Sequence, residues 1–290
     1  MSTGSGQANA DAATVRAAPG GSSARRAATA THSAFVLHSH DWSESSLIVE
    51  LFTRDAGRMV AAAKGAKRPT SQLRGVLMPF QLLLVQFVRS RGDDGEVRTL
   101  RNAEWAGGEA PAIRGPDWFA GFYLNELLLR LLARDDPHPR LFDAYAGTLS
   151  CLGDNEVRSE AALRAFELLL LRETGVLPEL NRTTLTQLSV QRERRYALRA
   201  EQGLVEATQA QGSLAGDVCL ELAAALQAWL AQTSGVQALG PLQAACARDL
   251  SALKAQLRNQ LLYHLGGAVL RTRQVMIDMQ RLLETGSPPR

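Results

Sequence analysis

Hydrophobic and polar positions change their period once along the chain. From Ser33 to about residue 106 the apolar residues gather in short segments of the length and composition of β-strands, and after Pro111 they recur at helical spacing. Two turn signals separate neighbouring strand segments, Asp55-Ala56-Gly57 and Gly92 to Gly95, and the second is typical of a hairpin. The five predicted strands are Ser33 to His38, Ser46 to Phe52, Arg58 to Ala63, Gln81 to Arg89 and Glu96 to Glu104.

Five short strands with one longer connection, here Lys64 to Phe80, are the layout of an OB-fold barrel. The part after Pro111 is mainly α-helical. We therefore predict an α+β protein with an OB-fold domain at 32–107 and a helical domain at 115–285. The predicted helices begin near Asp117 and then span His138 to Leu152, Glu156 to Thr174, Asp217 to Gln232, Pro241 to Leu265 and Leu270 to Thr285.

Two segments do not follow either period. Residues 1–31 are mostly Ala, Ser, Gly and Thr with a few Arg, which predicts a disordered tail, although an organelle transit peptide has a similar composition. The stretch near 176–213 is irregular apart from a possible small hairpin at Arg195 to Val205.

Positive charge is concentrated in one stretch, Arg54 to Arg74. It carries six cations against the single acid Asp55, whereas the whole chain has a net charge of +3. Such a concentration around a small barrel favours a polyanionic partner, with Trp42 as an aromatic that could stack on a base or pack over the barrel end. Ordinary solvated loop residues are the alternative. The predicted nucleic-acid-binding residues are Arg54, Arg58, Lys64, Lys67, Arg68, Arg74 and Trp42, and Arg89, Arg91, Arg98 and Arg101 could extend their face.

Catalytic and metal motifs are not found in the sequence. The glycines of Gly57 to Lys67 do not have P-loop spacing, and no GxSxG motif occurs. His38, His40 and Asp41 lack a further ligand cluster for a metal, and three widely spaced cysteines offer neither a disulfide framework nor a zinc clamp. The longest apolar run, Leu124 to Leu132, includes charged residues and is too short to span a membrane. We expect a cytoplasmic protein without enzymatic activity, metal or cofactor.

Several motifs in order resemble the bacterial RecO family of recombination mediators. They are AFVLHSHDWSESSLIVELFTRDAGRMVAAAKGAKRPTSQLRGVLMPFQLLLVQF, GEVRTLRNAE, FAGFYLNELLLRLLARDDPHPRLFDAY, ALRAFELLLLRETG and LLYHLGGAVLRTR, and they cover about residues 34–280. The resemblance implies a nucleoid-associated protein of DNA repair and homologous recombination. Such a protein binds single- and double-stranded DNA, anneals complementary strands, and works with RecR to load the RecA recombinase onto DNA coated by single-strand-binding protein.

The resemblance also implies a groove for the acidic, apolar C-terminal tail of the single-strand-binding protein. It places the tail-binding arginine at Arg164, beside Phe166, with Arg130 as a helper; a surface pair of Arg164 with Glu160 or Glu167 is the alternative. Arg271 and Arg273 could serve DNA or a partner. Some relatives carry a four-cysteine zinc module, but the corresponding Pro178 to Val205 has no cysteine, so no zinc is expected there. A scaffold that binds an acidic protein without DNA, or a hydrolase with an unrecognised site, are the other functions left open.

Overall fold

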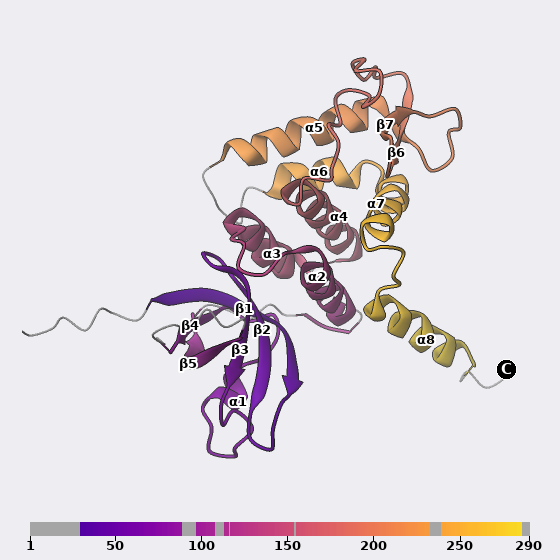
Figure 1. Ribbon diagram of the computed structural model, residues 1–290. Coiled ribbons are helices and arrows are strands. Elements are labelled where there is room, and N and C mark those ends of the chain that lie inside the picture. Colours follow the sequence, from indigo (N-terminus) through magenta and orange to yellow (C-terminus); the bar gives the residue numbers. More distant parts are fainter. Residues whose placement is uncertain are drawn as a thin grey trace, which may run out of the picture.

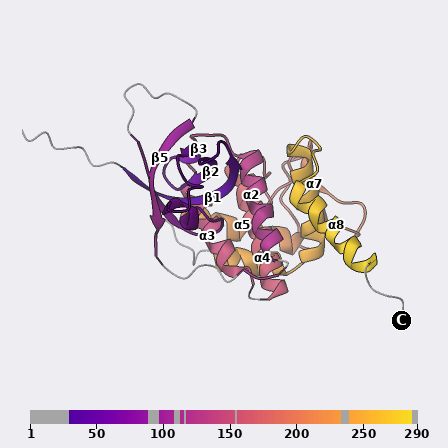
Figure 2. The same ribbon diagram turned by 90° about the horizontal axis from the view of Figure 1, so that it is seen from below.

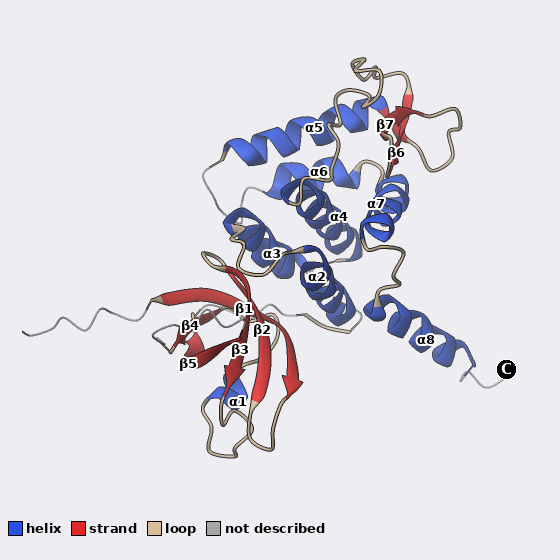
Figure 3. Cartoon of the chain, in the orientation of Figure 1, coloured by secondary structure: helices blue, strands red, loops and turns tan. Residues whose placement is uncertain are grey.

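The computed structural model has a β-barrel at one end and a bundle of helices at the other (Figure 1). The chain up to Trp105 makes the barrel and the chain from Asp117 onward makes the bundle, so the predicted α+β class is confirmed (Figure 3). The structure describes residues 30–88, 97–107, 113–115, 117–153, 155–232 and 239–285. The predicted tail up to residue 29, the hairpin turn Gly92 to Gly95, and the cations Arg89 and Arg91 lie outside these residues.

Five strands close the barrel in the order β1-β2-β3-β5-β4. Strands β3 and β5 pair in parallel and the other neighbours pair antiparallel. This closed five-stranded arrangement confirms the predicted OB-fold. The strands are β1 (Thr31–Asp41), β2 (Leu47–Thr53), β3 (Gly57–Ala63), β4 (Leu83–Phe87) and β5 (Val97–Trp105).

Two features of the barrel differ from the sequence prediction. Strand β1 begins at Thr31, inside the predicted tail, because its first residues pair with β4. The predicted connection after β3 contains a short helix, α1 (Leu73–Val76), whose Leu73 and Val76 pack against the barrel core. The helix covers the end of the barrel that is remote from the helical domain (Figure 1).

Seven helices make up the described part of the C-terminal domain, with α4 at its centre. Almost every residue of α4 from Ala161 to Leu171 is buried, and Gly175, with φ +75°, follows its C-terminus as predicted. The helices are α2 (Asp117–Leu131), α3 (Pro139–Cys151), α4 (Glu156–Glu173), α5 (Gly216–Ala231), α6 (Gly240–Ala247), α7 (Leu250–His264) and α8 (Arg271–Thr285).

The single helix predicted for Pro241 to Leu265 is wrong. The chain leaves helical geometry at Asp249, which has φ −149° and ψ 71°. The Asp249 carboxylate accepts a hydrogen bond from the N–H of Ala252 (3.1 Å) and so begins α7 as a separate helix.

The stretch near 176–213, predicted to be irregular, is an ordered insert. Strands β6 (Arg195–Arg199), β7 (Gly203–Glu206) and β8 (Leu214–Ala215) form a small sheet in the order β7-β6-β8, which includes the predicted hairpin. Thr184 joins the preceding loop to β7 through two hydrogen bonds with the backbone of Leu204, one in each direction (2.8 and 2.9 Å). Hydrogen bonds and packing thus hold this cysteine-free segment.

The barrel and the helices share a hydrophobic core. Phe35 of β1 and Phe52 of β2 turn outward from the barrel and contact Phe142 of α3, with ring centroids 5.1 and 5.4 Å from it. Asn125 of α2 is buried between the two halves, where it donates to the carbonyl of Leu37 (2.9 Å) and accepts from the hydroxyl of Tyr145 (2.5 Å). The two halves therefore form one packed unit.

Candidate nucleic-acid and partner-binding surfaces

The cations of the Arg54 to Arg74 stretch lie at two opposite ends of the barrel. Arg54 and Arg58 belong to the end that faces the helices. Arg54 donates through Nε and Nη2 to both carboxylate oxygens of Asp143 in α3 (2.9 Å each), and this hydrogen bonding raises the pKa of Arg54. Arg58 donates to the carbonyl of Leu132 (3.1 Å) and to Glu50 (3.0 Å). These contacts give Arg54 and Arg58 a place in the domain junction, which does not favour a role in DNA binding.

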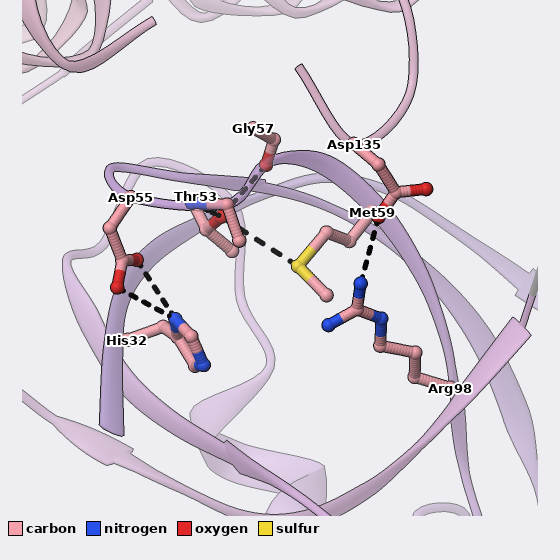
Figure 4. A network of polar contacts seen from close by, with 8 residues as sticks. His32, Thr53, Asp55, Gly57, Met59, Arg98 and Asp135 are labelled. Carbon is pink, nitrogen blue, oxygen red and sulfur yellow. Dashed lines mark hydrogen bonds and ion pairs between the residues drawn. The ribbon is translucent and has the colours of Figure 1, made fainter. Parts of the chain in front are cut away.

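Further polar contacts surround this junction, as Figure 4 shows for the barrel end beside Asp135. The hydroxyl of Thr53 donates to the carbonyl of Gly57 (2.8 Å), and Arg98 pairs with Asp135 (3.0 Å). Arg98, which was expected to extend the positive face, is therefore also occupied by the helical half.

The other predicted nucleic-acid-binding residues meet at the remote end of the barrel. The N–H of Lys67 donates to the carbonyl of Ser45 (2.9 Å), which joins the loop after β3 to the loop that carries Trp42. Lys67 pairs with Asp41 (3.0 Å), whereas Lys64, Arg68 and Arg74 are exposed and form no ion pair within the described parts of the chain. Trp42 is 58% exposed and so does not pack over the barrel. We call Trp42, Lys64, Lys67, Arg68 and Arg74 the barrel-end surface.

A groove of about 560 Å³ lies in the helical domain between α2, α4, α7 and α8. Figure 2 shows α2, α7 and α8 around this region. Most of its wall is apolar, and four cations, one each from α4 and α8 and two from α7, also line it. The apolar side chains include Phe119, Ala120, Leu163, Leu261, Leu265 and Met276. The cations are Arg164, Lys254, Arg258 and Arg273.

Arg164 is the buried cation of the groove, with 6% of its surface exposed. Its Nη2 pairs with Oε1 of Glu167 (2.8 Å), which also accepts the hydroxyl of Tyr123 (2.6 Å). Burial raises the pKa of Glu167 against the opposing effect of Arg164, and burial together with the nearby Glu167 raises the pKa of Tyr123 well above its ordinary value. The pair with Glu167 that the sequence left open does form, but it is buried, and Arg164 is the member of the pair that lines the groove.

The predictions for Phe166 and Arg130 need correction. Phe166 is fully buried, with its ring 6.1 Å from that of Tyr145, so it belongs to the core and cannot contact a partner. Because successive residues of a helix face different directions, Arg164 and Phe166 cannot share one face of α4. Arg130 is not among the groove residues and pairs instead with Glu126 (2.8 Å).

Glu126 fixes the first turn of α8, which forms one wall of the groove. Its carboxylate accepts hydrogen bonds from the N–H of Arg271 (2.8 Å) and from the N–H and hydroxyl of Thr272 (2.9 and 2.8 Å). Burial alone would raise the pKa of Glu126, but these hydrogen bonds and Arg130 together hold it below its ordinary value. Arg130 can therefore affect the groove only through Glu126.

Sequence reasoning did not identify Tyr123, Lys254 or Arg258 as groove residues, nor Glu167 as the buried partner of Arg164. The spacing of Arg164 and Glu167 signals a helical pair, but it does not show that the pair is buried. Lys254 and Arg258 lie one helical turn apart in a basic helix, which is a weak signal of a shared cationic face.

The described residues contain no group of three His, Cys, Asp or Glu side chains that could hold a metal ion. His38 and His40 do lie side by side on β1, with ring centroids 4.2 Å apart. Burial, followed by the neighbouring His40, lowers the pKa of His38. In the part of the chain that the structure describes, no helix is both long and apolar enough to cross a membrane.

Comparison with known proteins matches both halves of the chain. The family described as "Recombination protein O N terminal" matches residues 28–108, and "Recombination protein O C terminal" matches residues 116–273. The DNA repair protein RecO of Albidiferax ferrireducens is 49% identical over 255 residues, which cover 86% of this chain and 95% of the relative. That of Delftia acidovorans is 48% identical over 251 residues, which cover 86% and 96%. The chain, with its barrel and its helical domain, therefore belongs to the RecO family.

Proposed function

We propose that this protein is a non-enzymatic recombination mediator of DNA repair. It binds single- and double-stranded DNA and anneals complementary strands. Together with RecR, it helps to load the RecA recombinase onto DNA coated by single-strand-binding protein. The observation that carries the proposal is the groove, an apolar slot rimmed by cations next to a barrel with its own cationic end.

The groove fits an acidic peptide that ends in apolar residues, which is the chemistry of the tail of single-strand-binding protein. Phe119, Leu261 and Met276 provide an apolar wall, and the exposed Lys254 and Arg258 lie where acidic side chains of a peptide can reach them. Guanidinium groups bind carboxylates with paired, charge-assisted hydrogen bonds, so Arg164 and Arg258 suit such a ligand.

The barrel-end surface is the better candidate for DNA because three of its four cations are exposed and Trp42 is free to stack on a base. Only four of the six predicted cations belong to it, which lowers the expected number of phosphate contacts. Four contacts to a single strand give a salt slope of about −2.8, so affinity should fall about fiftyfold from 50 to 200 mM salt.

Strand annealing with and without single-strand-binding protein tests the proposed function directly. In the variant K64Q/R68Q/R74Q we expect annealing to fall and the slope of affinity against salt to become shallower by about 2. The matched control R192Q/R194Q/R199Q removes the same charge from exposed residues of the insert and should leave the slope unchanged. Equal loss in both variants would remove the DNA site from the barrel end.

A scaffold that binds an acidic protein without DNA is the second candidate, because the groove is itself suited to protein binding. Filter binding of an oligonucleotide at low salt separates the two. Retention of the oligonucleotide by the wild-type protein supports the mediator, and no retention supports the scaffold. RecA filament formation on coated DNA, measured with and without RecR, then tests the loading step.

A further inference from the structure

A fully buried carboxylate contacts two residues of the groove, and the proposed function does not use it. Glu167 of α4 has no exposed surface, and its two oxygens are unequally satisfied. Oε1 accepts from both Arg164 and Tyr123, whereas Oε2 has no hydrogen-bond partner. Burying a carboxylate costs several kcal/mol unless it is paired, so a partly satisfied one in a helix core calls for a physical reason.

The guanidinium of Arg164 shows the complementary feature. Its Nη2 is held by Glu167, but its buried Nε has no hydrogen-bond partner. A guanidinium has five N–H donors in a fixed plane, so holding one edge of that plane sets the direction of the others. The Glu167 contact therefore determines how Arg164 is presented to the groove, which Arg164 itself lines.

Tyr123 fixes the carboxylate in turn. It lies on α2, across the groove from α4, and its ring lines the groove while its hydroxyl donates to Glu167 (2.6 Å). The chain of contacts from Tyr123 to Glu167 to Arg164 thus spans two walls. It holds three rotatable side chains in one arrangement before any ligand binds.

We propose that Glu167, held by Tyr123, is a positioning residue that orients Arg164 for the terminal carboxylate of a bound peptide. The apolar wall around Arg164 disfavours an acidic side chain in the interior of a peptide. The carboxylate at the end of a peptide, in contrast, can reach the guanidinium while the neighbouring apolar residue packs on the wall. Glu167 and Tyr123 therefore set the specificity of the groove for a peptide end. This inference rests on the proposed function, because it assumes that an acidic peptide occupies the groove.

Two synthetic probes separate positioning from general binding. Both are fluorescein-labelled peptides of three aspartates followed by three apolar residues; one has a free terminal carboxylate and the other a terminal amide. Fluorescence anisotropy with the full chain gives two affinities and their ratio. In the wild-type protein we expect the free carboxylate to bind about tenfold more tightly, because a charge-assisted hydrogen bond is worth about 1.5 to 3 kcal/mol.

Glu167→Gln should reduce this ratio to about threefold or less, since a neutral acceptor holds a guanidinium about half as strongly as a charged one. Tyr123→Phe should reduce the ratio in the same direction by a smaller factor. Affinity for the amidated peptide should stay within about twofold in both variants, which a distorted groove would not allow. The control is Glu221→Gln on α5, which removes the same charge from a carboxylate that pairs with Arg248 outside the groove; its ratio should remain about tenfold.

A ratio that is unchanged or larger in Glu167→Gln overturns the inference, because it would mean that Glu167 only competes with the ligand for Arg164. If thermal denaturation shows that Glu167→Gln does not fold, the ratio in Tyr123→Phe decides by the same criterion. Failure of the wild-type protein to bind either peptide would instead overturn the proposed groove function, and the inference with it. Equal wild-type affinities for the two peptides would overturn the inference alone.

Discussion

Arg54 and Lys64 carry the same charge and flank the same strand, yet they contact different parts of the molecule. Arg54 precedes β3 and pairs with Asp143 of the helical domain, whereas Lys64 follows β3 and is exposed at the remote end. A strand of seven residues spans about 23 Å, so cations on either side of it cannot share one small surface. The sequence showed how many cations this stretch contains. The predicted strand within it already implied that the cations lie at two ends of the barrel.

Gly57 begins β3 where the barrel meets the loop between α2 and α3. It has φ +74°, and a Cβ added there would lie 2.1 Å from the carbonyl oxygen of Asp136. We expect Gly57→Ala to destabilise the protein by about 3 kcal/mol or more, because backbone strain and a clash with backbone act together. Chemical denaturation with linear extrapolation measures this change.

Gly175→Ala is the matched control for that substitution. Gly175 has φ +75°, but an added Cβ would meet no atom within 4 Å. Strain alone should then cost about 1 kcal/mol. Equal costs at the two positions would mean that the barrel can move away from Asp136 without loss.

Helix α8 depends on one carboxylate from α2. Because the pKa of Glu126 is lowered in the folded state, its contribution to stability is present above the ordinary value of 4.5 and is lost as pH falls through the lowered value. Glu126→Gln should weaken the first turn of α8 by about 1 kcal/mol, which corresponds to about fivefold less protection of its amides. Hydrogen exchange at pH 7, followed by mass spectrometry, measures this.

Arg130→Gln provides the comparison, since it removes the ion pair and leaves the hydrogen bonds from Glu126 to Arg271 and Thr272. It should reduce protection of α8 by less than twofold, in line with an i,i+4 pair worth about 0.3 to 0.5 kcal/mol. A larger effect than that of Glu126→Gln would contradict the role given to Glu126.

We expect metal chelators not to change the stability of the insert around β6 and β7. The described loop and hairpin have no cysteine, and the hydroxyls of Thr184 and Tyr196 accept hydrogen bonds from the N–H groups of Leu204 and Gln191. We expect the unfolding midpoint to be the same with and without a strong zinc chelator. A lower midpoint in chelator would reveal a bound metal.

The division of the predicted helix at Asp249 shows where periodicity stops being informative. Leu242, Cys246 and Leu253 are all buried, so the apolar pattern continues across the break. The separate start of α7 depends on the Asp249 side chain accepting from Ala252, and an aspartate within a helical pattern can equally be an exposed polar residue. The period located the helices but could not place this boundary.

The two halves of the molecule share a core because β1 is buried on both faces. Phe35 and Leu37 face the helices, whereas Ala34 and Val36 face the barrel interior. A continuous apolar run is typical of a strand covered on both sides, and the run from Ala34 to Leu37 is such a signal. The strand pattern alone does not identify what covers the outer face, since that depends on helices 80 or more residues away.

A shared core predicts one unfolding transition for the barrel and the helices together. Near-UV and far-UV circular dichroism should report the same midpoint in denaturant. Phe35→Ala should lower the stability of both halves by about 3 to 5 kcal/mol, because it leaves a cavity between β1 and α3. Two separated transitions would show that the halves fold independently.

The junction formed by Arg54, Arg58, Gly57 and Asn125 holds the barrel against the bundle at several points of the described chain. A DNA strand bound at the barrel-end surface and a protein tail bound in the groove would then be held at a fixed separation. Any movement of the DNA relative to the bound tail would have to come from flexibility of the tail and of the strand, because the barrel and the helical domain form one packed unit.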